Sequence, residues 1–166
     1  IGATLGRIAF ATAAAGIALV SKTLTASVKS AMESEQAMAE LNAVLKSTKG
    51  VAGVSIDALT AHAEALQKVT MFSDEAINAG QSMLLTFTNI GADVFPQATE
   101  AVLNLAEKFG SVDQAAVQLG KALNDPIAGV TALRRVGVML SDEQEKKIKD
   151  FMAVNDIASA QGVILA

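Results

Sequence analysis

Residues that end and start helices recur at short intervals along this chain, and they constrain its fold more than any other feature. We expect helices to end at glycines, namely Gly50, Gly53, Gly91, Gly110 and Gly137. We expect new helices to start at capping residues or prolines, namely Ser55, Ser73, Pro96, Ser111, the Asp125-Pro126 pair, Ser141 and Asp156. The segments between these signals are about 10 to 17 residues long, an ordinary length for a globular helix. The pattern predicts an all-α fold in which short helices form a compact bundle.

The composition agrees with closely packed helices. Hydrophobic residues make up 51% of the 166 residues, yet the chain has no Trp, no Tyr and only 6 Phe. Small side chains suit helix packing better than a β-sandwich, which favours aromatic and β-branched residues. A net charge of -4 argues against a specific nucleic-acid-binding surface. Because there is no cysteine, the chain can form neither a disulfide nor a thiolate metal site.

The first 50 residues are expected to form a long, Ala-rich apolar helix that leads into a small helical domain over residues 51–166. No residue between Arg7 and Lys22 is charged, and that run is shorter than the roughly 20 residues needed to span a bilayer. Residues at helical spacing form a candidate self-association face, namely Gly2, Gly6, Ala9, Ala13, Gly16, Val20 and Leu24. Gly2 and Gly6 make a GxxxG pattern, which permits close helix contact. Membrane insertion and burial against neighbouring helices are both open.

The second half of this segment has a near 3.5-residue repeat of apolar or small positions. The repeat includes Ala31, Met38, Leu41 and Leu45, and it ends by about Lys49. A coiled-coil seam has this spacing, but Ser27 and Ser34 interrupt it and strong flanking charge pairs are absent. A single amphipathic helix on a bundle explains the pattern as well.

Apolar spacing also predicts which side of each later helix faces the core. For the helix over residues 55–70 the predicted face includes Val69, and for the helix after Ser73 it extends to Phe87 and Ile90. The helix that starts at Pro96 and stops at Gly110 is expected to bury Val102, Leu105, Ala106 and Phe109. In the helix that begins at Pro126, Ile127, Val130 and Leu133 are expected to point inward. Gly137 is predicted to be a left-handed cap.

Few side chains suggest chemistry. His62 is the only histidine and stands beside Glu64 and near Glu75, but one His without Cys or a second His is a poor metal-ligand set. Arg134 and Arg135 are either cations that complement a helix end or an anion site. There is no phosphate-binding loop, no HExxH and no GxSxG. We therefore predict no catalytic, cofactor-binding or metal residues.

Three stretches resemble the tape measure proteins of long-tailed bacteriophages and prophages. The most specific runs from Leu119 to Met152 and contains ALNDP followed by TALRRVGV. The stretch from Phe87 to Ala106 resembles the same family through its Thr86-Phe87 helix end and its VFP loop, Val94 to Pro96. Glu35 to Gly50 is similar to the helix that precedes this domain in the family. The first 30 residues match only in composition.

The resemblance implies a non-enzymatic structural protein that sets tail length inside the tail tube. It implies parallel copies, hence a homo-oligomer, with tail tube and tail tip proteins, tail assembly chaperones and the host membrane during infection as partners. It also implies a place in the virion, or in the host cytoplasm during assembly, and a part in DNA ejection. The long rod of the family is missing, and we expect the chain to be a piece of a longer one. The alternatives are a membrane-active, pore-forming helical protein and a fragment of a cell-wall hydrolase.

Overall fold

The structure is a computed structural model that describes residues 28–29, 31–50 and 52–166. It divides into two units, residues 1–36 and residues 37–166, and each is described by itself. In the first unit the described residues are helical, Lys29 Nζ lies 3.5 Å from Glu33 Oε1, and Val28 and Met32 are exposed. The candidate self-association residues, Gly2 to Leu24, lie outside the described residues.

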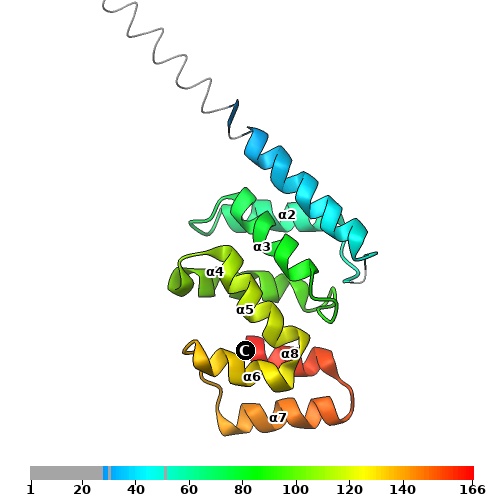
Figure 1. The fold of residues 1–166 in the computed structure, drawn as a ribbon, viewed down its shortest axis with the longest axis vertical. Coiled ribbons are helices and arrows are strands. Elements are labelled where there is room, and N and C mark those ends of the chain that lie inside the picture. The colour runs from blue at the N-terminus through cyan, green and yellow to red at the C-terminus, as the bar shows by residue number, and fades with distance from the viewer. Residues whose placement is uncertain (1–27, 30, 51) are drawn as a thin grey trace, which may run out of the picture. The chain divides into compact units, whose positions relative to one another are not determined.

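The second unit is all-helical in its described residues, which confirms the all-α class (Figure 1). The long helix expected over the first 50 residues stays a prediction, because residues 1–27 lie outside the described residues. Residues 37–47 are helical. The labelled helices follow as α2 (Ile56–Gln67), α3 (Asp74–Leu85), α4 (Phe95–Phe109), α5 (Val112–Asn124), α6 (Pro126–Arg135), α7 (Asp142–Ala153) and α8 (Ile157–Leu165). Within this unit α7 lies at the end opposite α2 (Figure 1).

The predicted helix starts are confirmed, and in every labelled helix except α4 a local side chain accepts a hydrogen bond from an N–H group of the first turn. Helix α4 begins at Phe95, has Pro96 in its first turn and has no side-chain cap. The serine side chains at Ser55, Ser73, Ser111 and Ser141 each accept a hydrogen bond from the third helical residue. Ser141 forms a full capping box, since Gln144 Oε1 accepts from the backbone N–H of Ser141 at 3.0 Å. Aspartates start the remaining two helices with predicted caps, α6 at Asp125 and α8 at Asp156.

The predicted left-handed cap at Gly137 is also confirmed, with φ of 87°. The Gly137 N–H donates to the carbonyl oxygen of Arg134 at 3.2 Å, and that of Val138 donates to Leu133 at 2.9 Å. This is the Schellman arrangement, and it binds carbonyls that the end of α6 leaves free. Asn155 has φ of 58° and makes the same turn after α7.

Helix α5 lies at the centre of the larger unit and packs against α3, α4, α6 and α8. Its small residues permit this crowding. A Cβ added at Gly120 would strike the ring of Phe87. On α6, a Cβ added at Gly129 would strike the backbone of Ala122 on α5. The two glycines therefore set how closely α5 approaches its neighbours.

The core consists of two clusters of buried side chains. The main cluster joins residues 37–47 to α2, α3, α4 and α5, and its largest fully buried members include Phe95, Leu41, Ile77, Leu84 and Leu123. A smaller cluster forms around Val130, Ile148 and Ala160 of α6, α7 and α8. Burial of these side chains supplies most of the folding free energy, at about 1.5–3 kcal/mol for each large one.

Of the two interpretations left open for the near 3.5-residue repeat, the described residues 37–47 fit a single amphipathic helix on the bundle. Leu41 is fully buried, and Val44 and Leu45 pack against the main cluster. Lys49 and Gly50 end this helix with positive φ values of 53° and 65°. The predicted division of the chain at residue 50 stays a prediction.

The structure differs from the predictions for four residues at helix ends and faces. Helix α2 ends at Gln67, so Val69 does not extend its apolar face and is 78% exposed. Helix α3 ends at Leu85, and Phe87 packs from the following turn. Ile127 is 47% exposed, because it lies on the solvent side of α6, whereas Pro126, Val130 and Leu133 are buried. Phe109, expected to be buried, is only partly so.

Candidate functional site

His62 does not belong to a metal site in the described part of the chain. Its Nε2 lies 3.9 Å from Glu100 Oε1, so the two residues join α2 to α4 when the histidine is protonated. Its side chain is 23% exposed. Among the described residues, no group of three or more His, Cys, Asp or Glu side chains is placed to hold a metal ion. His62 is a partly buried helical histidine.

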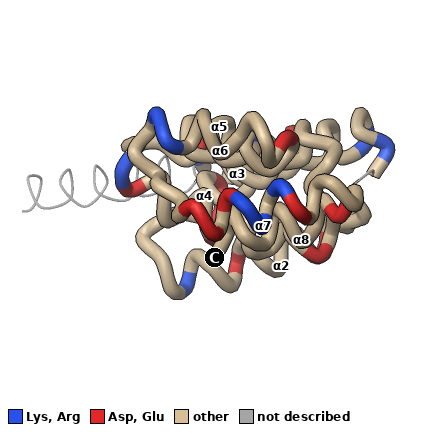
Figure 2. Tube along the Cα trace, turned by 90° about the horizontal axis from the view of Figure 1, so that it is seen from below, with Lys and Arg blue, Asp and Glu red and all other residues tan. Residues whose placement is uncertain are grey.

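Arg134 forms an ion pair with Glu145 and thereby ties α6 to α7. Both arginines lie in the last turn of α6, as predicted, where cations complement the negative helix end. Arg135 is exposed. Helix α7 contains both acidic and basic residues along its length (Figure 2), and Lys147 Nζ lies 3.0 Å from Glu143 Oε1. The charges of α7 form a solvated face, with both signs interspersed.

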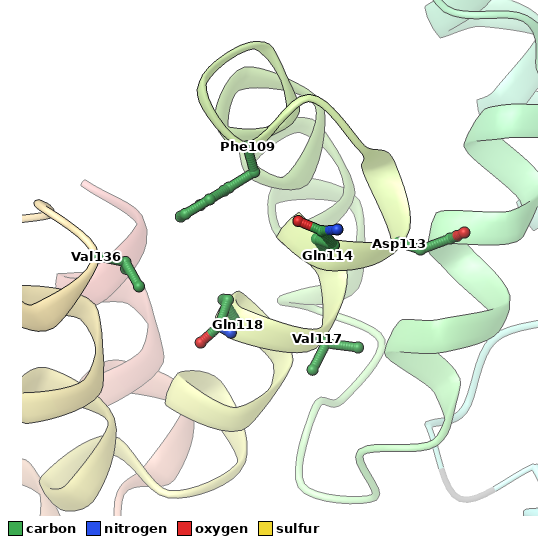
Figure 3. Close-up of a pocket in the computed structure, with 6 residues that line it drawn as sticks. All are labelled: Phe109, Asp113, Gln114, Val117, Gln118 and Val136. Carbon is green, nitrogen blue, oxygen red and sulfur yellow. The ribbon is translucent and has the colours of Figure 1, made fainter.

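An apolar groove of about 410 Å³ lies along the first half of α5, between the end of α4 and the residue that follows α6 (Figure 3). The residues that line it are Phe109, Asp113, Gln114, Val117, Gln118 and Val136. Phe109 and Val136 approach it from opposite sides, while Asp113 points away from both (Figure 3). Apolar walls with two carboxamides suit an apolar side chain better than a charged ligand.

Sequence reasoning missed this groove. The spacing of apolar residues correctly placed Phe109 on the inner side of α4, but the groove leaves part of it uncovered. The opposite wall, Val136, comes from the turn after α6, more than twenty residues further along the chain. No local pattern reports that the two segments meet.

A second apolar feature is the turn between α2 and α3, in which Val69 is 78% and Met71 82% exposed. We call residues 69–71 the 69–71 turn. Thr70 holds it in place: its Oγ1 donates to the Leu66 carbonyl oxygen at 2.9 Å and accepts from the Phe72 N–H at 3.4 Å. Phe72 packs against the main cluster. The turn is therefore anchored on both sides while Val69 and Met71 stay in solvent.

Two carboxylates follow this turn at the start of α3. Burial raises the pKa of Asp74, and the neighbouring Glu75 adds to the rise. The backbone N–H of Glu75 and the Ser73 hydroxyl lower the pKa of Glu75. Asp74 Oδ1 also accepts a hydrogen bond from Gln67 Nε2 at 2.9 Å. The start of α3 thus places negative charge beside the exposed turn.

Helix α3 also buries polar groups. The Gln81 side chain is fully buried, and neither its Oε1 nor its Nε2 has a hydrogen-bond partner among the described residues. The same holds for Asn78 Oδ1 and Ser82 Oγ. Such groups cost free energy when buried without partners, so α3 is less stable than its packing alone would make it.

No protein-family model, no curated protein and no solved structure matches this chain. Among the described residues, no helix combines the length and the hydropathy that crossing a membrane requires.

Proposed function

We propose that this chain is part of a phage tail tape measure protein, a non-enzymatic component that sets tail length inside the tail tube. In this role it associates with other copies of itself and with tail tube and tail tip proteins, and tail assembly chaperones hold it before the tube forms. It leaves the tube ahead of the DNA during infection. The single observation that carries this proposal is the run from Leu119 to Met152, with its ALNDP and TALRRVGV motifs.

The residues of that run connect α5 to α6, and α6 to the turn that follows it. Asp125 ends α5 and caps α6, and Pro126 occupies the first helical position of α6. Gly129 allows α6 to contact the backbone of Ala122. Gly137 then closes the Schellman turn. These residues hold α5 and α6 in a compact helical arrangement. Such an arrangement supports a structural role for this part of the chain.

The proposal is tested on purified tails. Peptides of this chain are to be sought by mass spectrometry in intact tails from the virus or prophage that encodes it, and in tails that have already released their DNA. We expect the peptides in intact tails and a marked loss after ejection. Intact tails that lack the peptides would overturn the proposal.

The uncharged run from Ile8 to Ser21 favours a second function, membrane insertion by a pore-forming helical protein. Its apolar residues suit a lipid environment, although the run is shorter than a bilayer-spanning helix. The full chain is to be mixed with liposomes, alongside the variants Gly6→Glu and Ala13→Glu. If the parent chain binds liposomes and either variant abolishes that binding, the result supports membrane activity. If the chain does not bind at any lipid ratio, membrane activity is excluded.

A further inference from the structure

Residues 37–47 form a helix that buries little of itself against the rest of its unit, and we call this helix the strap. Leu41 is its one fully buried residue, whereas α5 buries seven of its 13 residues. Near the start of the strap, the Met38 sulfur lies 3.6 Å from Thr60 Oγ1 of α2 and 3.9 Å from Asn78 Nδ2 of α3. A thioether sulfur is only a weak hydrogen-bond acceptor. The strap therefore lies across α2 and α3 and is loosely attached to both.

The surface of α3 beneath the strap is partly polar. Asn78 and Ser82 are 3% and 4% exposed, and neither Asn78 Oδ1 nor Ser82 Oγ has a hydrogen-bond partner among the described residues. Glu40 and Val44 of the strap line a hollow of about 200 Å³ together with Ser82, so the strap does not close tightly on α3. When the strap moves away, water can bond to both polar groups, which lowers the free-energy cost of opening.

The turn that follows the strap is strained. The Gly50 N–H donates to the carbonyl oxygen of Leu45 and the Lys49 N–H to that of Lys46, both at 3.1 Å, which is the Schellman arrangement. Lys49 has φ of 53° and occupies the position in this turn where glycine is usual. A side chain disfavours that conformation. Extending the backbone at Lys49 would relieve the strain.

The chain beyond this turn is anchored. Ala52 is 4% exposed and belongs to the main cluster, against which Val54 also packs. Gly50 is less confined, because a Cβ added there meets nothing within 4 Å. The strap can therefore pivot at residues 49–50 while α2 keeps its place.

We infer that the strap swings out at residues 49–50 and that the site it leaves takes the strap of a second copy of this chain. The structure shows what fits this site, because the same residues already cover it. The exchange keeps the contacts of the closed strap and removes the strain at Lys49. Short strained hinges favour such swapping of an element between copies, and a reciprocal exchange closes as a two-fold dimer. The inference goes beyond the tail assignment and does not depend on it.

Cross-linking tests the exchange, because the chain has no cysteine of its own. Full chains with Met38→Cys are incubated with affinity-tagged full chains that have Thr60→Cys, and a short bifunctional maleimide is added. Both positions are partly exposed. A matched mixture replaces Met38→Cys with Ala43→Cys, an exposed position on the same strap. We expect the Met38→Cys mixture to give at least about tenfold more product with one chain of each kind, because docking raises the effective concentration of the two thiols.

Two hinge variants predict opposite changes. Lys49→Gly relaxes the closed turn and should lower the amount of linked product several-fold, whereas Gly50→Ala strains that turn and should raise it. Light scattering on the hinge variants without added cysteines provides an independent measurement. The dimer fraction should increase from Lys49→Gly to the parent to Gly50→Ala. Circular dichroism of every variant checks that the helices are retained.

Three results would overturn the inference. The first is an equal amount of linked product from the Met38→Cys and Ala43→Cys mixtures. The second is a pair of hinge variants that leave the amount unchanged or alter it in the reverse order. The third is light scattering that finds only monomers for the parent and for Gly50→Ala at every concentration measured.

Discussion

Asn89 and Asn124, 35 residues apart, are joined by two hydrogen bonds. The Asn89 N–H donates to Asn124 Oδ1 at 3.3 Å, and Asn89 Nδ2 donates to the Asn124 carbonyl oxygen at 2.8 Å. Gln161 completes this node from α8: its Nε2 donates to the carbonyl oxygens of Asn89 at 2.7 Å and Leu123 at 2.9 Å. The turn after α3, the end of α5 and the last helix thus meet at one set of polar contacts.

We expect Gln161→Met to lower the free energy of unfolding by about 1–3 kcal/mol, because it leaves the carbonyl oxygen of Leu123 buried without its donor. Gln161 is 1% exposed, so water cannot replace the amide without a change in packing. Urea unfolding followed by circular dichroism measures the change. Gln97→Met, at an exposed position on α4, serves as the control and should have little effect.

We expect Gln81→Met, unlike Gln161→Met, to raise the free energy of unfolding. That side chain is fully buried and neither end is hydrogen bonded within the described residues. Replacing it with a methionine of similar shape removes two unsatisfied polar atoms, and we expect a gain of about 1 kcal/mol. Urea unfolding again provides the measurement. A loss comparable to that of Gln161→Met would show that Gln81 has partners that the contacts described above do not include.

Two helical glycines should respond in opposite ways to alanine. Gly129→Ala places a Cβ against the backbone of Ala122, which cannot move aside cheaply, and we expect a loss of about 1–3 kcal/mol. Nothing lies within 4 Å of a Cβ added at Gly162, so Gly162→Ala should stabilise α8 by about 0.5–1 kcal/mol. Thermal unfolding of both variants beside the parent chain tests the pair. A gain at Gly129 would mean that α5 and α6 are further apart than described.

Two residues with positive φ at helix ends, Gly137 and Asn155, should respond differently to substitution. Gly137 has φ of 87°, so Gly137→Val should cost more than about 1 kcal/mol, because a β-branched residue is strained there. Asn155 has φ of 58°, so Asn155→Gly should be neutral or slightly stabilising. Thermal melts of the two variants are the measurement, and an unchanged melt for Gly137→Val contradicts the assigned cap.

Stability in acid should depend on the cap of α8. The side chain and the backbone N–H of Ser159 lower the pKa of Asp156 below its ordinary value of 3.8. Since the pKa is depressed in the folded state, the cap contributes stability above pH 3.8, and this contribution is lost as the pH falls through the folded value. Asp156→Asn keeps a capping side chain but removes its charge. We expect melting temperatures of this variant to vary less below pH 3.8 than those of the parent, with Asp150→Asn, which caps no helix, as the control.

The sequence predicted the helix starts and most helix ends because the signals for them are local. A serine three residues before an N–H, or a glycine with positive φ, acts within one turn of chain. The errors at Val69 and Ile127 have another origin: apolar spacing shows that a side chain suits a core but not whether a neighbour covers it. The groove walls Phe109 and Val136, and the contact of Gly129 with Ala122, depend on how helices pack. No short pattern contains that information.

Helix α5 should tolerate few substitutions, because its neighbours pack closely around it. A side chain at Gly120 would meet the ring of Phe87, and a side chain at Gly129 of α6 would meet the backbone of Ala122 on α5. Helix α7, by contrast, has Ile148 as its one buried residue. Substitutions should therefore accumulate freely along α7 and rarely along α5. A library of random variants, selected for folding and sequenced, would be expected to retain the middle of this chain while its charged outer helix becomes unrecognisable.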